Sequence, residues 1–368
     1  MQSCVNESES LLVDLGDRSY SIIIEPDATA SVKQAIDCVR TAGRKVIIVV
    51  DSIVAQKQAD FMDAIGDSIP RFEVPSGERS KSFGTYGAVL DFLADNRLDR
   101  RSLLVAIGGG VVGDLAGFSA ASFLRGIDFL QVPTTLLSMV DSSVGGKTAI
   151  NLEAGKNLVG LFHQPRGVFI GTSILKTLSK REFASGMAEV IKYGMLGDED
   201  LFRDLESGPV LTAQSKALSS IIRRCCASKA RIVKDDERET ATCDGRATLN
   251  LGHTFAHAIE NVAGYGSYLH GEAVAIGLIG ATRLSVGLGR IGGSEVARVE
   301  RVLSKHGLPT GLRDPLVVDQ LIEAMQNDKK VREGALRFVV LKAMGTARTS
   351  DGVDIDLVAQ TWRQLGAS

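Results

Sequence analysis

The feature of this sequence that most restricts its fold is a glycine-rich turn between an apolar run and an apolar helical stretch. Residues 103–118 read LLVAIGGGVVGDLAGF, which places Gly108, Gly109, Gly110 and Gly113 after a run typical of a buried strand. Glycines allow backbone N–H groups to approach a pyrophosphate, and the start of a helix adds unpaired N–H groups and positive dipole charge. The turn therefore predicts a dinucleotide site. Its spacing differs from the common GxGxxG pattern, and such turns also form for purely steric reasons.

Short apolar runs alternate with longer amphipathic stretches over residues 11–177. This alternation is typical of βαβ units that build a mostly parallel sheet. The runs predict strands at residues 19–24, 45–50, 71–74, 103–107 and 129–132. The amphipathic stretches predict helices at residues 30–42, 53–65 and 81–94.

Helical periodicity takes over from residue 179 onward. It predicts helices at residues 183–196, 211–234, 249–263, 271–287 and 293–306. A late apolar run, residues 336–341, is either a strand or a buried helix segment, because periodicity does not separate the two. With 368 residues and about 150 residues per domain, two domains are expected. We place an α/β domain at residues 1–177 and a mostly α-helical domain at residues 178–368.

Charge and cysteine content exclude several classes of protein. The 42 Lys and Arg residues are balanced by 44 Asp and Glu residues, so no basic field favours nucleic acid. The five cysteines include no CxxC pair, which predicts neither a disulfide framework nor a thiolate zinc site and fits a cytoplasmic protein. Residues 1–9 are polar and acidic, and no apolar run approaches about 18 residues, so neither a signal peptide nor a membrane span is expected.

Asp51 directly follows the strand expected at residues 45–50. At that place a carboxylate can accept hydrogen bonds from the two hydroxyls of an adenosine ribose. Because a helical stretch comes next, Asp51 is equally well placed to cap that helix, and the sequence leaves the two roles open. A carboxylate there would disfavour a 2′-phosphate, so NAD is favoured over NADP if a nicotinamide cofactor binds.

Three of the five histidines, His253, His257 and His270, are close together in the sequence. His253 and His257 are four residues apart in a helical stretch and so share a face, while His270 opens the next helix. Two neutral imidazoles and a carboxylate with one open position would make a catalytic zinc-type site. Glu189, on an apolar helix, is the attractive third ligand, although Lys192 could neutralise it instead. Histidines that only pack between helices are the alternative, and the spacing does not tell which two would bind a metal.

A polar, glycine-rich segment, DSSVGGKTAINLEAGKN, lies between two apolar regions at residues 141–157. Its lysines and asparagines suit a polyhydroxylated anionic ligand, and a solvated hairpin loop is the alternative. The candidate ligand-binding residues of this segment are Asp141, Lys147, Asn151, Lys156 and Asn157. The same ambiguity holds for a second set of polar residues, which are Arg246, Asn250, Asp328, Lys329 and Lys330.

Six blocks of the sequence carry a resemblance to a known family. They are PSGERSKS from Pro75, IGGGVVGDLAGFSAASFLRG from Ile107, QVPTTLLSMVDSSVGGKTAINLEAGKNLVGLFHQP from Gln131, GMAEVIKYGML from Gly186, LNLGHTFAHAIE from Leu249 and LHGEAVAIG from Leu269. In this order, and along almost the whole chain, they resemble the sugar-phosphate cyclases, and within these the 3-dehydroquinate synthase family.

The resemblance implies an N-terminal Rossmann-like NAD-binding domain, a helical metal-binding domain, and a homodimer with its active site in the cleft between the domains. It implies Glu189, His253 and His270 as ligands of one Zn or Co ion per subunit, and it leaves His257 to the substrate. The NAD contacts that it implies are Asp51, Glu78, Lys81, Gly109, Gly110, Asp114, Thr134, Thr135, Lys147, Lys156 and Thr177.

The resemblance further implies a substrate and a reaction. The substrate is 3-deoxy-D-arabino-heptulosonate 7-phosphate, which becomes 3-dehydroquinate and phosphate through transient oxidation by NAD, phosphate elimination, re-reduction and an intramolecular aldol step. The residues implied at the substrate carboxylate are Lys147 and Arg246. Those implied at its phosphate are Asn250, His257, Lys330 and Arg125 of the partner subunit. Those implied at its hydroxyls are Asp141, Asn157, Lys192 and Lys229.

Two related activities are the alternatives: a cyclase acting on sedoheptulose 7-phosphate, and a metal-dependent polyol dehydrogenase of the glycerol dehydrogenase type. The first would be expected to lack several of the anion-binding residues, and the GGKTAIN and GHTFAHAIE blocks argue against the second. A non-catalytic descendant would be expected to have lost ligands or lysines. The sequence departs from the family pattern in two places. The stretch between Glu239 and Arg246 is longer, which puts the position of Arg246 in question, and Ala256 replaces a more usual glycine.

Overall fold

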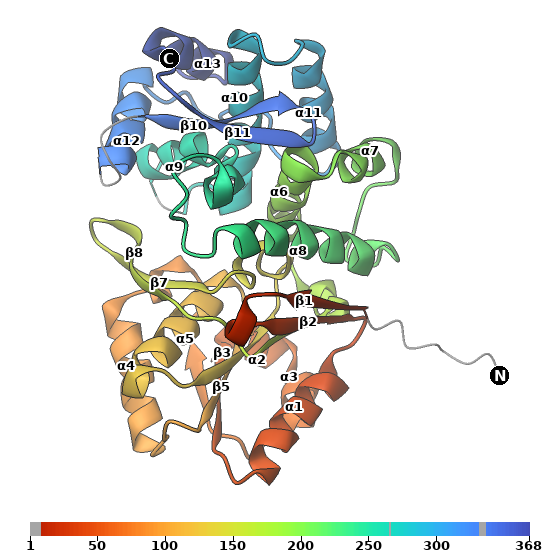
Figure 1. The fold of residues 1–368 in the computed structure, drawn as a ribbon, viewed down its shortest axis with the longest axis vertical. Helices are drawn as coiled ribbons and strands as arrows, with labels where there is room; N and C mark the ends of the chain where they lie inside the picture. The colour runs from red at the N-terminus through yellow and green to blue at the C-terminus, as the bar shows by residue number, and fades with distance from the viewer. Residues whose placement is uncertain (1–8, 265, 331–335) are drawn as a thin grey trace, which may run out of the picture. The chain divides into compact units, whose positions relative to one another are not determined.

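The computed structural model describes residues 9–264, 266–330 and 336–368, with the side chains of residues 328–330 outside that description. Its contacts divide the chain into two compact units (Figure 1). Unit 1 comprises the described residues up to Leu178 together with Ala213–Lys234. Unit 2 comprises the described residues of Ser179–Thr212 and Asp235–Ser368.

Unit 1 is built on a seven-stranded sheet in the order β1-β2-β9-β6-β5-β3-β4. β1 and β2 are antiparallel, and the other neighbouring strands are parallel. The predicted mostly parallel sheet is confirmed, as are the five strands expected from apolar runs, whereas β1 and β9 were not expected. The strands are β1 (Glu9–Val13), β2 (Tyr20–Glu25), β3 (Val46–Asp51), β4 (Arg71–Val74), β5 (Leu103–Gly108), β6 (Asp128–Pro133) and β9 (Gly167–Gly171).

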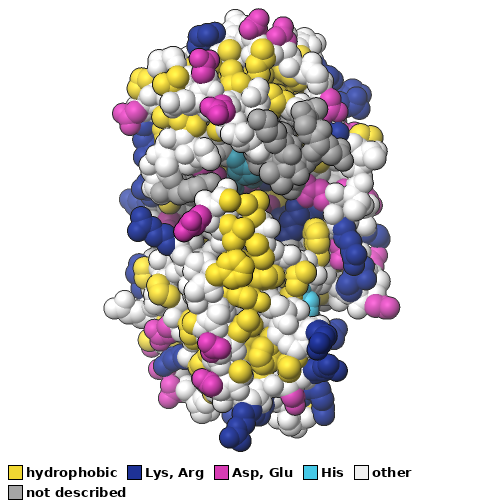
Figure 2. Space-filling view, turned by 90° about the vertical axis from the view of Figure 1, so that its left-hand side faces the viewer, with side chains coloured by type: hydrophobic (Ala, Val, Ile, Leu, Met, Phe, Trp, Pro, Cys, Tyr) yellow, Lys and Arg dark blue, Asp and Glu magenta, His cyan; other side chains and the backbone are white. Residues whose placement is uncertain are grey.

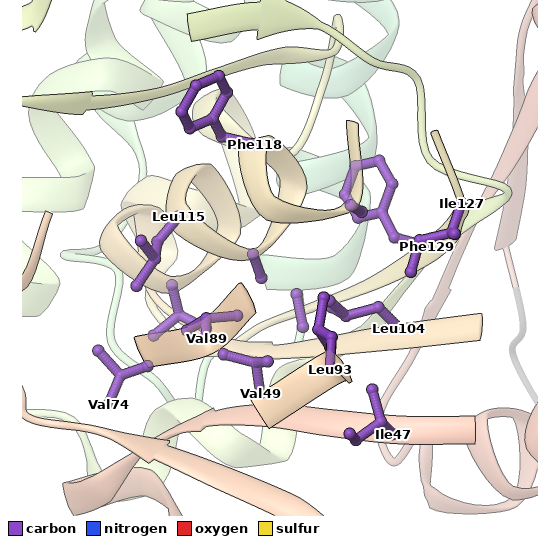
Figure 3. Close-up of a cluster of buried hydrophobic side chains, with 14 of the residues drawn as sticks. Ile47, Val49, Val74, Val89, Leu93, Leu104, Leu115, Phe118, Ile127 and Phe129 are labelled. Carbon is purple, nitrogen blue, oxygen red and sulfur yellow. The ribbon is translucent and has the colours of Figure 1, made fainter. Parts of the chain in front are cut away.

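Helices cover both faces of this sheet (Figure 1). Successive side chains of a strand point to opposite faces, so β3 contributes to two separate cores. Ile47 and Val49 join the core that includes residues of α4 and α5, which Figure 3 shows, while Ile48 and Val50 join the core that includes residues of α1 and α3. The helices of unit 1 are α1 (Thr29–Thr41), α2 (Ser52–Lys57), α3 (Ala59–Gly66), α4 (Phe83–Asp95), α5 (Gly110–Ser122) and α8 (Leu218–Asp235).

Two helices of unit 1 differ from the predicted pattern. The helix expected at residues 53–65 is divided into α2 and α3, because Gln58 leaves helical geometry with φ of −119° and ψ of 38°. The helix expected at residues 211–234 begins only at Leu218, and this helix, α8, groups with the sheet of unit 1 although it follows the first helices of unit 2 in the chain.

The strand order of the sheet reverses at β3. β4 pairs with one side of β3, and β5, the next strand along the chain, pairs with the other side. In open parallel sheets, ligands bind outside the carboxyl ends of the strands at such a switch point. Asp51 ends β3 and Gly108 ends β5. The aspartate and the glycine-rich turn singled out in the sequence are therefore neighbours at the switch point.

Most of the polar segment at residues 141–157 forms an antiparallel hairpin, in which β7 (Lys147–Leu152) pairs with β8 (Gly155–Phe162). β7 lies close to α5, because a Cβ on Gly117 of α5 would come within 2.5 Å of Thr148 Cγ2. The hairpin that the sequence offered as an alternative is thus present, and within unit 1 its strand β7 packs against α5.

Unit 2 is mostly helical, as predicted. All but the first residue of the apolar run at 336–341 lie in a strand, so the strand alternative for this run is confirmed. Within the described parts of the chain, no helix has the length and apolar character needed to cross a membrane. The elements of unit 2 are α6 (Lys180–Gly197), α7 (Glu199–Ser207), α9 (His253–Val262), α10 (His270–Gly287), α11 (Ser294–Lys305), α12 (Val318–Lys330), α13 (Ile355–Gln364), β10 (Arg337–Ala343) and β11 (Thr346–Asp351).

Helix α10 is buried along most of its length and is the centre of unit 2. Two of its glycines allow neighbouring backbones to approach. A Cβ on Gly271 would overlap the carbonyl oxygen of Ser185 in α6, and a Cβ on Gly277 would overlap that of Gly252, directly before α9. These close contacts fix α6, α9 and α10 against one another, and each of the three carries one residue of the candidate metal site.

Candidate functional site

Glu189, His253 and His270 come together in unit 2. Glu189 lies in the middle of α6, while His253 and His270 are the first residues of α9 and α10. One ligand atom from each residue lies within 4.8 Å of the other two. The Nε2 atoms of His253 and His270 are 3.5 and 4.0 Å from Glu189 Oε1. The structure therefore brings these two histidines to the glutamate, and His257, which is exposed, is not part of the group.

The Glu189 carboxylate is fully buried, with 0% of its side chain exposed. Neither of its oxygens accepts a hydrogen bond from a described residue. Its charge is compensated by an ion pair with Lys192, which is 1% exposed. Lys192 therefore neutralises Glu189, as the sequence allowed. An ionised carboxylate that is shielded from water needs cationic partners. Lys192 pairs with Oε2, and both imidazoles approach Oε1, so this donor set fits a divalent ion such as zinc.

The orientation of the two imidazoles also fits a metal site. His253 Nδ1 lies 3.2 Å from the Leu251 carbonyl oxygen, and His270 Nδ1 lies 3.4 Å from Glu260 Oε1. Carbonyl and carboxylate oxygens can only accept, so these contacts favour a proton on each Nδ1. Each Nε2 lone pair then faces the Glu189 carboxylate. Two lone pairs and an anion directed at one place repel one another, and a bound cation would offset this repulsion.

Glu260 was not among the residues singled out in the sequence. It lies on α9, seven residues after His253 and three after His257, and it is buried. Positions separated by three, four and seven residues share a helix face. An acidic residue on the same face as two histidines was the signal that could have found it.

The glycine-rich turn forms the start of α5, at the carboxyl edge of the sheet of unit 1. Gly109 is the N-cap residue, and a Cβ on it would lie 3.2 Å from Thr135 Cγ2. Gly108 has a steric role as well, because a Cβ there would lie 2.7 Å from Val112 Cβ. Thr134, the residue after β6, has a buried hydroxyl with no hydrogen-bond partner among the described residues. The backbone N–H groups at the start of this helix and the Thr134 hydroxyl fit a dinucleotide.

Asp51 is a helix cap in this structure. Its Oδ1 accepts hydrogen bonds from the backbone N–H groups of Ile53 at 2.9 Å and Val54 at 3.2 Å. The capping role left open by the sequence is therefore observed, and the ribose contact stays a prediction. Thr177, another predicted NAD contact, accepts a hydrogen bond from Gln58 Nε2 at 2.7 Å.

Lys81 is the centre of a polar network in unit 1. Its Nζ lies 2.6 Å from Asp114 Oδ2 and also donates to Asn157 Oδ1. Burial raises the pKa of the Asp114 carboxyl, and the nearby Lys81 ammonium acts in the opposite direction. Asn151 Nδ2 donates to Glu78 Oε1 at 2.8 Å, which ties the β7–β8 hairpin to the segment after β4. The Asn157 N–H donates to Asn151 Oδ1 at 2.9 Å, so these five predicted site residues belong to one connected group.

Asp141 and Lys229 form a second group in unit 1. Lys229 Nζ on α8 donates to the Asp141 carbonyl oxygen at 2.7 Å and to its carboxylate at 2.9 Å. Lys147 is exposed at the start of β7, and Lys156 is half-buried on β8. Arg125 is exposed in a short turn with a left-handed backbone, φ of 68°.

Arg246 is buried within the loop that is longer than the family pattern. The Asp236 carboxylate organises this loop by accepting backbone hydrogen bonds from Thr240 and Ala241 at 2.8 and 3.3 Å, and from Arg246 at 3.0 Å. Burial alone would raise the pKa of Asp236, but these N–H groups hold it below the usual value. Arg246 Nη1 donates to the Glu237 carbonyl oxygen at 2.6 Å. The guanidinium is therefore held by the loop itself.

The remaining candidates lie in or near α9 and α12. Asn250 is half-buried just before α9, and Ala256 is fully buried inside it. Lys330 is the last residue of α12, and its side chain, like those of Asp328 and Lys329, lies outside the described part of the structure.

Solved structures define the class of protein to which this fold belongs. The chain is similar to 2-epi-5-epi-valiolone synthase from Streptomyces hygroscopicus subsp. jinggangensis 5008 with NAD+ and Zn²⁺ bound, at 25% identity and a TM-score of 0.85, covering 96% of this chain and 98% of that chain. It is also similar to 2-deoxy-scyllo-inosose synthase complexed with carbaglucose-6-phosphate, NAD+ and Co²⁺, at 26% identity and a TM-score of 0.83, covering 97% and 99%. The fold is that of the sugar-phosphate cyclases, so the predicted fold class is confirmed.

Sequence comparisons identify the family within that class. The models for the 3-dehydroquinate synthase N-terminal and C-terminal regions match residues 71–185 and 186–331. A 3-dehydroquinate synthase from Opitutus terrae (strain DSM 11246 / JCM 15787 / PB90-1) is 58% identical over 359 residues, which are 98% of this chain and 99% of that protein. The chain belongs to the 3-dehydroquinate synthase family, and the resemblance stated from the six sequence blocks is confirmed.

Proposed function

We propose that this chain converts 3-deoxy-D-arabino-heptulosonate 7-phosphate into 3-dehydroquinate and phosphate. The observation that carries the proposal is the buried Glu189 carboxylate faced by the Nε2 atoms of His253 and His270, in a chain of this family. A purely structural descendant would have no need to keep a buried carboxylate whose Oε1 faces two imidazoles, because such a group is costly to desolvate.

The two units hold the two cofactors in this proposal. The carboxyl edge of unit 1 binds NAD through the start of α5 and the buried Thr134 hydroxyl, and Glu189, His253 and His270 of unit 2 bind one zinc or cobalt ion. When bound, NAD supplies the transient oxidation and re-reduction of the substrate, and the divalent ion supplies polarisation of a substrate oxygen.

The charged side chains of the chain bind and orient the anionic substrate. Arg246 and Lys147 are assigned to its carboxylate, since a guanidinium and an ammonium are the usual partners of such a group. The Asp141 oxygens hold the Lys229 ammonium in one position, where it orients a hydroxyl. Lys192, in its ion pair with Glu189, does the same next to the metal ligands.

A turnover assay tests the proposal and separates it from the two alternatives. Purified protein is given NAD, zinc or cobalt, and either the heptulosonate phosphate or sedoheptulose 7-phosphate, while phosphate release and NADH absorbance are recorded. We expect sustained phosphate release from the heptulosonate alone, without accumulation of NADH. Phosphate release only from sedoheptulose 7-phosphate would show that the chain is a cyclase for that substrate, which lacks the carboxylate. Formation of one NADH per substrate would identify a dehydrogenase.

A homodimer and a cytoplasmic location complete the proposal. Apolar side chains gather on one face of unit 1 (Figure 2), and the exposed apolar residues of this unit include Phe83, Leu158, Leu161 and Phe162. An exposed apolar patch of this kind is typical of a surface that a second subunit covers. The four described cysteines are free, which agrees with a reducing compartment. Light scattering at a known protein concentration distinguishes a dimer from a monomer.

A further inference from the structure

Glu260 contacts one of the three proposed metal ligands without being one of them. Its carboxylate is 5% exposed, and its Oε1 lies 3.4 Å from Nδ1 of His270, on the side of the ring opposite to the nitrogen that faces Glu189. The two residues belong to neighbouring helices, α9 and α10. The contact therefore connects the ring of His270 to the helix that begins with His253.

The two histidines of the cluster are supported by acceptors of different charge. The Nδ1 atom of His253 lies next to a neutral backbone carbonyl, that of Leu251, whereas Nδ1 of His270 lies next to the Glu260 carboxylate. The side chain of His270 is also the more exposed, 33% against 11% for His253. Packing alone restrains the ring of His270 less, so this ring depends more on a charged acceptor.

We propose that Glu260 is a positioning residue that fixes the ring of His270 and keeps its proton on Nδ1, so that Nε2 presents a lone pair to the metal ion. A carboxylate behind a metal-binding imidazole also makes the other nitrogen a stronger donor, and loss of such a partner typically weakens metal binding by about 10–100-fold. The inference rests on the metal site of the proposed function.

The test measures metal binding directly, with Zn²⁺ alone as the probe. The dissociation constant of the full chain is obtained by competition with a chromophoric chelator for the native protein, Glu260→Ala and Glu260→Gln. We expect Glu260→Ala to bind Zn²⁺ about 10–100-fold more weakly. Glu260→Gln keeps an oxygen acceptor of the same shape without the charge, and we expect a smaller loss from it.

Glu206→Gln is the matched control. It removes a carboxylate from unit 2 that forms two hydrogen bonds with Arg298, at 2.9 and 2.7 Å, and touches none of the three proposed ligands. The control should bind Zn²⁺ as the native protein does. With Co²⁺ in place of Zn²⁺, the visible absorption of the bound ion should change in Glu260→Ala and stay the same in Glu206→Gln.

Two results would overturn the role of Glu260: native Zn²⁺ affinity in Glu260→Ala, or an equal loss of affinity in the control. If Glu260→Ala does not fold, Glu260→Gln takes its place under the same criteria. His270→Ala separates this inference from the proposed function. Tight Zn²⁺ binding by His270→Ala would show that the metal site itself is wrong, whereas loss in His270→Ala with none in Glu260→Ala would remove only the role of Glu260.

Discussion

Three predicted NAD contacts of unit 1 follow the ends of separate parallel strands, whereas the three candidate metal ligands of unit 2 lie on helices that approach one another at glycines. Asp51, Gly109 and Thr134 lie at or directly after the ends of β3, β5 and β6, and the parallel pairing of these strands brings them to one edge. Glu189 and His270 meet because Gly271 lets α10 rest on α6. Topology thus places the first set of residues, and close packing places the second.

This difference should be visible in the effects of mutations. A residue that follows a strand end is positioned by the backbone of the sheet, so a substitution there in unit 1 should affect binding more than stability. A buried charged residue of unit 2 is part of the packing as well as of the site, so its removal should affect binding and stability together.

The largest effect is expected for Glu189→Ala. It leaves the buried Lys192 without its carboxylate, which should cost about 3–5 kcal/mol in the free energy of unfolding. Metal binding should be lost, and with it on the order of a thousandfold in kcat. Denaturant unfolding, metal content and turnover measure the three effects. Adding Lys192→Met should restore stability without restoring metal, and a double variant as unstable as the single one would contradict this account.

Lys81→Met is the corresponding test in unit 1. The change removes the cation next to Asp114, whose pKa is already raised by burial. We expect the NAD dissociation constant to rise about tenfold or more, and the free energy of unfolding to fall by about 1–3 kcal/mol. Calorimetric titration with NAD and denaturant unfolding check both values. Unchanged NAD affinity would separate Lys81 from the cofactor site.

Asp236→Asn tests the loop that carries Arg246, and its effect should depend on pH. The pKa of Asp236 is lower in the folded state than in the unfolded chain, so its ionised form stabilises the fold above the unfolded pKa. That contribution is lost as the pH falls through the folded pKa. The variant should therefore be less stable than the native protein by about 1–3 kcal/mol at pH 7, and the difference should shrink in acid. A difference that stays constant down to about pH 3 would refute the assignment.

The smallest effect is expected for Gly109→Ala. The added methyl group would lie 3.2 Å from Thr135 Cγ2 at the start of α5, so NAD should bind several-fold more weakly while unfolding changes by less than about 1 kcal/mol. Gly87→Ala in α4 is the control, because no atom lies within 4 Å of its added Cβ. It should leave NAD binding unchanged. Equal effects of the two variants on NAD binding would show that the turn at Gly109 is steric only.

Much of unit 1 could be predicted because its central strands are continuous apolar runs. The exceptions have physical reasons. β9 has the sequence GVFIG, with a glycine at each end and too few residues to show a period, and β1 begins with two polar residues. The division of one predicted helix at Gln58 left no Gly or Pro signal in the sequence. A strand can be predicted where its apolar run is long enough to be seen locally. The pairing of β9 between β2 and β6 depends on the whole sheet and cannot be predicted in this way.

The candidate metal site could be predicted only in part from the sequence. Spacing grouped three histidines, but only the packing of α9 and α10 on α6 brings His253 and His270 to Glu189, while His257 is exposed and outside the group. Glu260 escaped notice because the His270 ring that it contacts belongs to the next helix.

The most direct test of this account is the Zn²⁺ affinity of three single variants, His253→Ala, His257→Ala and His270→Ala, measured by chelator competition on the full chain. We predict that the native protein binds one ion per chain, that the first and third variants lose tight binding, and that His257→Ala keeps it. Loss of the ion in His257→Ala, or tight binding retained in His270→Ala, would contradict the metal site on which the proposed function depends.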